Sequence, residues 1–238
     1  MVLKVKKLNK TIKNKKVLND VSFKVKAWEI YGFLWPNGAG KTTTMKCIME
    51  FISYDSGKIE VFWTEWLSLD DKQNIGFMPE NTYLYKHLKT KEFLEFNWNF
   101  FGLEWKKLKK RINELLEKVG LEHAENKYLK EFSKWMLQRI GLAQAIINKP
   151  KLVFLDEPMS GLDPIGRKMV KDLIAELKQN WTTVFFNTHI LSDVESVCDR
   201  VSIIDKWNLI VEWEDVKKIL KKQSLEEFFI EKVTEFDN

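Results

Sequence analysis

Glycine is scarce in this sequence for its length. There are 10 glycines among 238 residues, whereas ordinary usage of roughly 7% predicts about 17. Tryptophan shows the opposite imbalance, because 10 tryptophans are present although this residue is normally among the rarest. The shortage of glycine limits the positions at which the chain can turn tightly or bring its backbone close to a ligand.

Cysteine is also scarce, and long apolar runs are missing. Cys47 and Cys198 have neither metal-ligand spacing nor the pattern of a disulfide framework, which favours a reducing compartment. No apolar run reaches the length of about 18 residues that a membrane span needs, and no apolar signal segment follows the lysine-rich start at 1–7. The net charge of +5 suits a nucleotide or an anionic membrane surface as a partner, but it is too small to predict nucleic-acid binding.

Strand-like runs that alternate with helix-like segments predict an α/β fold with a mainly parallel sheet. A block with helical periodicity at about 85–148 interrupts this alternation, and we expect it to be an inserted helical subdomain. The main domain would cover 1–220, and an amphipathic tail would cover 221–238. Residues 9–16 are polar and are expected to form a connection, while 206–208 are expected to be the turn of a hairpin.

A phosphate-binding loop is predicted between the apolar run 30–34 and a helix that begins at Lys41. The sequence fits the pattern G-x-x-x-x-G-K-[ST] at every specified position except the first, where Trp35 replaces glycine. In such a loop, backbone N–H groups and a helix N-terminus bind the β-phosphate, Lys41 reaches the β- and γ-phosphates, and Thr42 ligates Mg²⁺. The predicted nucleotide-binding residues of this loop are Asn37, Gly38, Ala39, Gly40, Lys41, Thr42 and Thr43.

Two carboxylates and a histidine complete the predicted site. Asp156 and Glu157 follow the apolar strand 152–155, so Asp156 is placed to hold Mg²⁺ and Glu157 to act as the general base for the attacking water. His189 follows the next strand and could bond to the γ-phosphate. The alternative for the acidic pair is a surface cap of the strand, which the four apolar residues before it and the P-loop disfavour. The alternative for His189 is a polar loop residue, which fits the histidine taken alone and is disfavoured only by the order of the motifs. Catalysis is therefore predicted for Lys41, Glu157 and His189.

These motifs, in this order, resemble those of the nucleotide-binding subunits of ABC transporters. The resemblance runs from about Val2 to Val216. It rests on the P-loop and on four further segments. These are similar to the Walker B strand (Lys151–Glu157), the D-loop (Ser160–Asp163), the switch histidine (His189 in Asn187-Thr188-His189) and the signature LSGGQ (Phe132–Met136, followed by Gln138 and Arg139). Met78-Pro79-Glu80, which has no glutamine where the Q-loop would have one, is most like the ABC-2 exporter branch.

The resemblance implies a P-loop NTPase (RecA-like) core with a mainly parallel sheet, an N-terminal antiparallel β subdomain and an α-helical signature subdomain. It also implies an ATPase subunit at the cytoplasmic face of the membrane, which uses ATP and Mg²⁺ to power a transmembrane permease, by analogy an exporter. Two copies would form a head-to-tail dimer, in which Ser133 of one copy reaches the ATP on the other and Asp163 lies near the twofold contact. Ser133 can also be a plain helix N-cap. No nucleic-acid partner is implied.

Three further assignments follow from the resemblance. Glu80 would touch the metal and its water, although a solvated loop acid fits equally well. Ile12 stands where many members stack an aromatic ring on adenine, so base stacking should be weak. Five aromatic residues could line a groove for a helix of the permease, although core packing explains most of them: Tyr83, Tyr85, Phe93, Phe96 and Trp98.

Seven tryptophans stand where similar ABC subunits usually have glycine: Trp28, Trp35, Trp63, Trp135, Trp181, Trp207 and Trp213. Returning them to glycine would raise the glycine count to the ordinary value of about 17. We hypothesise that a codon recorded as tryptophan is read as glycine in the source organism. The alternative is that the tryptophans are genuine, which would make the chain a catalytically degenerate nucleotide-binding or regulatory subunit. A soluble ABC-type ATPase acting on ribosomes or DNA is a third reading.

Overall fold

The structure is a computed structural model that describes residues 1–34, 40–81, 84–102 and 104–237. Its strands are β1 (Leu3–Ile12), β2 (Lys15–Val25), β3 (Ile30–Leu34), β4 (Ser56–Val61), β5 (Ile75–Met78), β6 (Leu152–Asp156), β7 (Thr183–Thr188), β8 (Arg200–Asp205) and β9 (Asn208–Asp215). Its helices are α1 (Lys41–Ile48), α2 (Leu69–Gln73), α3 (Thr90–Phe100), α4 (Trp105–Lys118), α5 (Lys134–Ala145), α6 (Pro164–Gln179), α7 (Leu191–Val197), α8 (Val216–Leu220) and α9 (Leu225–Asp237), with 3-10 turns at Glu122–Ala124 and Leu129–Glu131.

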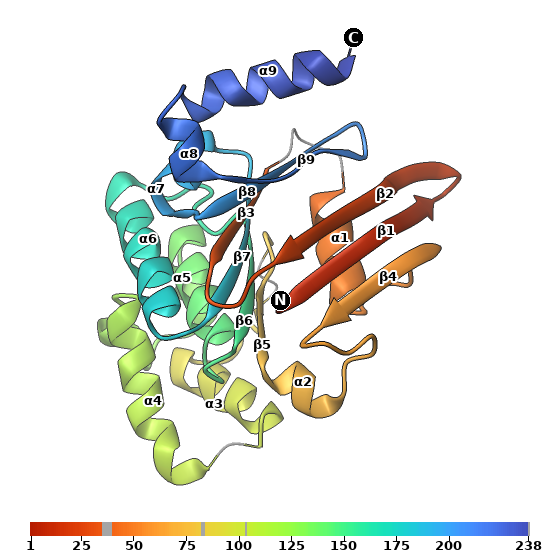
Figure 1. Cartoon of the computed structure of the whole chain (residues 1–238). Coiled ribbons are helices and arrows are strands. Elements are labelled where there is room, and N and C mark those ends of the chain that lie inside the picture. Colours follow the sequence, from red (N-terminus) through yellow and green to blue (C-terminus); the bar gives the residue numbers. More distant parts are fainter. Residues whose placement is uncertain (35–39, 82–83, 103, 238) are drawn as a thin grey trace.

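The described strands form one sheet in the order β4-β1-β2-β9-β8-β3-β7-β6-β5 (Figure 1). The five strands from β8 to β5 are parallel, as the alternation of strands and helices predicted. Strands β1, β2 and β4 pair antiparallel at the other end of the sheet. The fold is therefore the predicted α/β architecture, and the antiparallel strands form the N-terminal β subdomain that the resemblance implied.

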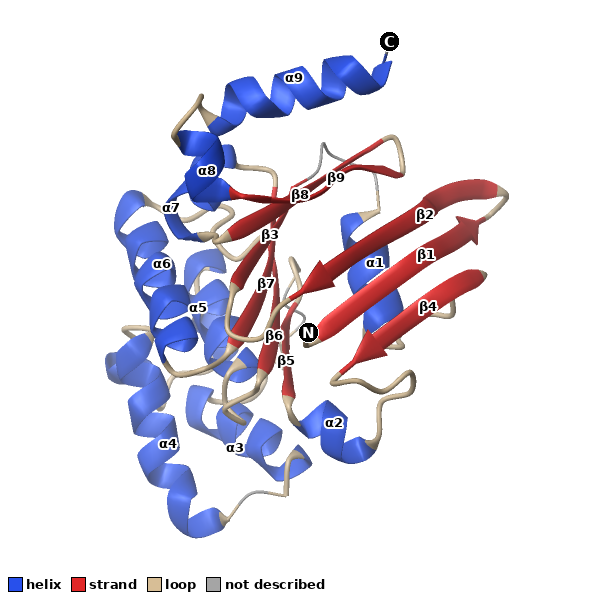
Figure 2. Ribbon diagram, in the orientation of Figure 1, coloured by secondary structure: helices blue, strands red, loops and turns tan. Residues whose placement is uncertain are grey.

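The parallel strands are buried on both faces, which explains their continuous apolar sequences. Alternate residues of β3 face different cores: Ile30 and Leu34 pack on one side, and Tyr31 and Phe33 on the other. Helices α3 to α7 cover the first face, while α1 lies on the second, between the parallel strands and the antiparallel part (Figure 2). Most of the apolar side chains that the described residues bury belong to these two cores.

The polar connection predicted at residues 9–16 is wrong, because β1 and β2 continue through it as a hairpin. Ile12 pairs with Lys15 across a turn at Lys13 and Asn14, whose φ values are 46° and 62°. Two successive positive φ values are the mark of the two-residue turn that fits the twist of a hairpin. The strands are polar here because this end of the hairpin is largely exposed, so no apolar alternation marks them.

Helix α1 begins at Lys41, as predicted, whereas the short helix α2 was not predicted. Helix α2 has five residues, too few for a periodic pattern, and a capping box between Ser68 and Asp71 stabilises its start. Helices α3, α4 and α5 lie between β5 and β6 along the chain, within the stretch 85–148. The predicted hairpin turn at 206–208 is confirmed by the pairing of Asp205 with Asn208. No helix in the described ranges is both long enough and apolar enough to span a bilayer.

Candidate functional site

Five of the predicted site residues meet at the C-terminal edge of the parallel strands. The Lys41 Nζ atom lies 2.5 Å from the Glu157 Oε1 atom. The Thr42 hydroxyl donates a hydrogen bond to the Asp156 carboxylate over 3.0 Å. The His189 Nδ1 atom lies 2.9 Å from the same Glu157 oxygen. The five side chains therefore form one connected cluster, although 116 positions separate Lys41 from Glu157 in the sequence.

The sheet topology brings these residues together. Leu34, at the end of β3, pairs with Thr188 of β7, and Asp156, at the end of β6, pairs with Asn187. Helix α1 begins at Lys41, and its N-cap Gly40 has a φ of 102°, a conformation that glycine adopts without strain. The edge where parallel strands end is the usual ligand-binding position in open α/β sheets.

Three contacts in the cluster were not predicted. The Asn187 amide donates to Asp156 over 3.3 Å, and the Thr188 hydroxyl lies 3.5 Å from Glu157. Gln138 of α5 donates to the Glu157 backbone carbonyl over 3.2 Å, which ties this helix to the site. The two β7 residues directly precede His189, so the strand ladder explains their position, whereas no sequence signal indicated the contact of Gln138.

Glu157 adopts a backbone conformation that is unusual for a glutamate. Its φ is 51°, and its amide donates to the Asn187 carbonyl over 3.0 Å. Left-handed conformations of non-glycine residues cost of order 1–3 kcal/mol and gather at functional sites. The neighbouring contacts to Lys41 and His189 hold the carboxylate of this buried residue in place.

Burial raises the pKa of the Asp156 carboxyl above its ordinary value. The hydrogen bonds from Asn187 and Thr42 and the charge of Lys41 oppose this rise, and the nearby Glu80 carboxylate adds to it. The ionised carboxylate is therefore less well solvated in the folded chain than in water, so a bound cation would stabilise it.

We expect Asp156→Asn to raise the melting temperature of the nucleotide-free chain at neutral pH. A carboxyl whose pKa is raised on folding destabilises the native state once pH exceeds the unfolded value, near 3.9 for Asp. The difference between variant and parent should therefore be largest at neutral pH and disappear below about pH 4. Thermal denaturation over this pH range measures it. A variant that is less stable than its parent at pH 7 would contradict the prediction.

The residues of the cluster fit a magnesium ion that is shared with phosphate groups. Thr42 and Asp156 offer a hydroxyl and a carboxylate oxygen 3.0 Å apart, and oxygen is the ligand that this ion prefers. Among the described residues, no group of three or more His, Cys, Asp and Glu side chains could hold a metal without other ligands. Magnesium usually binds through one or two carboxylates together with substrate phosphates, which agrees with this sparse set.

The other predicted site residues lie in α1, just after β5, at the start of α5 or outside the described part of the chain. Glu80 is exposed just after β5, and its charge reaches Asp156. Ser133 is the N-cap of α5, which is the alternative role predicted for it. Its hydroxyl oxygen accepts a hydrogen bond from the Met136 amide over 3.2 Å. Thr43 follows Thr42 in α1. The loop residues Trp35, Asn37, Gly38 and Ala39 and the groove residue Tyr83 lie outside the described residues.

Comparisons with known proteins find related sequences. The model of the ABC transporter family matches residues 18–160. An uncharacterized ABC transporter ATP-binding protein of Synechocystis is 43% identical over 201 residues, which are 83% of this chain and 57% of that protein. The bacitracin transport ATP-binding protein BcrA of Bacillus licheniformis is 38% identical over 226 residues, which are 93% of this chain and 73% of that protein.

The likeness extends to a solved structure. The ATP-binding subunit of an ABC transporter has a TM-score of 0.89 to this chain at 28% identity, and the match covers 98% of this chain and 100% of that one. The family model spans more than half of the chain, and the cluster of Lys41, Thr42, Asp156, Glu157 and His189 joins the motifs that carried the resemblance. The chain therefore belongs to the family of ABC transporter ATP-binding proteins.

Proposed function

We propose that this chain binds and hydrolyses ATP and so powers a membrane exporter. The observation that carries the proposal is the contact of Lys41 with Glu157 beside the Thr42–Asp156 pair. One edge of the sheet then holds a cation that can bind phosphate, a buried carboxylate that can activate water and oxygen atoms that can bind Mg²⁺. Positioning and charge stabilisation of this kind account for most of the catalysis of phosphoryl transfer.

The ion pair between Lys41 and Glu157 suggests how nucleotide prepares the site. Lys41 neutralises Glu157 in this structure at an Nζ–Oε1 distance of 2.5 Å. A triphosphate offers Lys41 a second anionic partner, which would leave Glu157 free to accept a proton from the attacking water. His189 would orient the γ-phosphate and hold Glu157. Mg²⁺, held by Thr42 and Asp156 with Glu80 nearby, would neutralise charge on the phosphates.

Two copies of the chain would complete the site head to tail. Ser133 caps the N-terminus of α5, an end that attracts anions, and would reach the ATP bound to the other copy. Asp163 caps α6 by accepting the Gly166 amide over 2.7 Å, and it would lie near the twofold contact. The Gln138–Glu157 hydrogen bond could couple movements of α5 to the catalytic carboxylate.

A transmembrane permease is the proposed partner, at the cytoplasmic face of the membrane. The main domain would then be 1–220, with 85–148 as the helical subdomain and 221–238 as the tail. Of the aromatic residues predicted to form a groove, Phe93 and Trp98 are buried in the core, but Tyr85 and Phe96 are exposed and pack edge to face with a centroid distance of 5.3 Å. Such a patch suits a helix of the permease. The export direction is inferred by analogy from the resemblance of Met78-Pro79-Glu80 to the ABC-2 exporter branch.

A nucleotide-binding subunit without catalytic activity is the second candidate. The Trp135 ring lies in the first turn of α5, packed on Arg139 with 3.5 Å between the ring centroid and the guanidinium carbon. An indole at this position would take up space that a phosphate or the second copy needs. This candidate requires that the tryptophans are genuine.

An ATPase assay separates the two candidates. We expect Trp35→Gly/Trp135→Gly to hydrolyse ATP at least about tenfold faster than the recorded sequence, because glycine lets the backbone come close to a phosphate. A tenfold faster rate corresponds to an activation barrier that is lower by about 1.4 kcal/mol. Trp66→Gly, a change in an exposed loop, serves as the control and should leave the rate unchanged. Equal inactivity of the double variant and the recorded sequence would favour the non-catalytic candidate.

A further inference from the structure

We propose that the cellular protein carries glycine, not tryptophan, at positions 28, 63, 135, 181 and 207. Glycine at these positions is expected whether or not the chain hydrolyses ATP. Backbone conformations and side-chain packing support it, and both are independent of the residue counts.

Four tryptophans have left-handed backbone conformations. The φ values are 63° at Trp28, 70° at Trp63, 63° at Trp181 and 67° at Trp207. Four of the nine tryptophans that the structure describes thus lie in this region, against nine of all the other described non-glycine residues. A side chain with a Cβ atom is strained there, and a bulky one is a genuine outlier. Tryptophan would be an unusual choice at each position, whereas glycine would carry no strain.

The turn at each position is one that glycine normally occupies. Trp63 and Trp207 are second in two-residue hairpin turns, after Phe62 and Lys206 with φ values of 51° and 45°. Strand pairing closes both turns, between Val61 and Thr64 and between Asp205 and Asn208. Turns with two positive φ values favour glycine at the second position.

Trp181 ends helix α6 in a Schellman motif. The Trp181 amide donates to the Lys178 carbonyl over 3.0 Å, and the Thr182 amide donates to the Leu177 carbonyl over 2.9 Å. In a Schellman motif the residue at this position has a left-handed backbone conformation, and it is usually glycine. Trp28 occupies the turn between β2 and β3, with a single positive φ, as glycine does in a type II turn.

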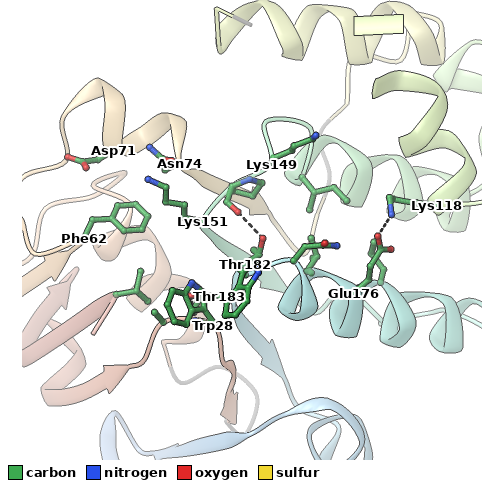
Figure 3. Close-up of a pocket in the computed structure, with 18 of the residues that line it drawn as sticks. Trp28, Phe62, Asp71, Asn74, Lys118, Lys149, Lys151, Glu176, Thr182 and Thr183 are labelled. Carbon is green, nitrogen blue, oxygen red and sulfur yellow. Dashed lines mark hydrogen bonds and ion pairs between the residues drawn. The ribbon is translucent and has the colours of Figure 1, made fainter. Parts of the chain in front are cut away.

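Three of the four left-handed tryptophans show little compensating packing, whereas the Trp207 ring packs against a buried core and its centroid lies 4.8 Å from the Lys15 Nζ atom. Trp28, Trp63 and Trp181 are 53%, 77% and 67% exposed, and the rings of Trp28 and Trp181 meet edge to face at 5.0 Å. All three line a surface cavity at the edge where β6 and β7 begin, away from the predicted ATP site. Figure 3 shows this cavity with Trp28 labelled. With glycine at these positions the cavity would lose its indole rings, so we assign it no ligand.

Trp135 lies in a helix, and its packing supplies the argument. Its indole nitrogen is buried and has no hydrogen-bond partner among the residues that the structure describes, and the same holds for Trp207. A buried indole N–H usually has a partner. The ring also presses on α6, since a Cβ atom added to Gly166 would lie only 2.5 Å from the Trp135 Nε1 atom. Glycine at position 135 would remove the unpaired N–H group and open the N-terminus of α5.

Peptide masses from the cellular protein test the proposal. Trypsin releases every position concerned in peptides of moderate length: 27–41, 59–72, 135–139, 179–200 and 207–217. In protein isolated from the organism that encodes it, fragment spectra should show a glycine residue mass at positions 28, 63, 135, 181 and 207. The corresponding codons should be UGA. Peptide 140–151, which contains no tryptophan, is the control and should have its recorded mass.

The outcome decides the proposal independently of enzyme activity. Tryptophan masses at these positions, or UGG codons, would overturn it even if the protein hydrolyses ATP. Glycine masses would support it even if the protein proved inactive, so a failure of the proposed function would remain distinguishable.

A matched pair of variants of the recombinant chain tests the backbone argument. Trp63 and Trp66 are three residues apart and equally exposed, at 77% and 76%, but only Trp63 has a positive φ. Trp63→Gly should raise the melting temperature by about 2–4 °C because it relieves strain, whereas Trp66→Gly should not raise it. No rise for Trp63→Gly, or the same rise for both variants, would contradict the argument.

Discussion

Glu157→Gln, introduced together with Trp35→Gly/Trp135→Gly, is expected to lower the rate of ATP hydrolysis by about 10²–10⁴-fold, the usual contribution of a general base. The glutamine amide keeps the shape of the side chain but cannot take a proton from water. The buried carboxylate of Glu157 lies between Lys41 and His189, so no other acid in the cluster occupies the same position. Steady-state phosphate release measures the rate.

Binding of ATP should survive the same change. Lys41 loses its ion pair with Glu157 and becomes free to contact phosphate, so the affinity for ATP should be equal or higher. Fluorescent-nucleotide titration measures this affinity. Glu226→Gln, in the exposed first turn of α9, is the matched control and should alter neither quantity. A variant of Glu157 that retains the full rate would remove this residue from the proposed mechanism.

Arg200→Ala is expected to destabilise the fold by about 3–5 kcal/mol, because it leaves a buried carboxylate without its partner. The Arg200 guanidinium contacts both Glu29 carboxylate oxygens, at 3.0 and 3.3 Å, and also the Lys24 carbonyl at 3.1 Å. It lies 4.3 Å from the centre of the Trp213 ring. Both charged residues are buried at the ends where β3 and β8 begin.

Urea denaturation with and without the partner charge tests this prediction. Burial raises the pKa of Glu29, while the Lys26 amide and Arg200 lower it. Without Arg200 the pKa of Glu29 should rise further, so the loss of stability should be greatest at neutral pH and shrink as acid protonates Glu29.

Glu29→Leu/Arg200→Met should be much less destabilised than Arg200→Ala. Lys232→Ala, at an exposed ion pair, is the control and should cost less than about 1 kcal/mol. Equal stability of Arg200→Ala and the control would contradict the prediction.

Two elements of secondary structure were not predicted from the sequence pattern, and each has a local reason. Residues 9–16 are polar because they form the exposed end of a hairpin, so no alternation marked them as strands. The helix α2 was too short for a periodic pattern. Asn187 and Gln138 belong to motifs that the sequence displayed, but their contacts with Asp156 and Glu157 depend on strand register and on the packing of α5.

The sequence by itself determined the class of fold, the order of the motifs and the residue types of the site. Apolar runs and a glycine-rich loop before Lys41 are local features, and local chemistry suffices to recognise them. It also displayed the excess of tryptophan over glycine. Only the tertiary structure decided that Lys41 and Glu157 form an ion pair, because side chains 116 positions apart meet only when β6 pairs with β7 and β7 with β3. The strain at Trp28, Trp63, Trp181 and Trp207 likewise became visible only in the backbone of the closed turns, since φ follows from how the strands and helices are joined.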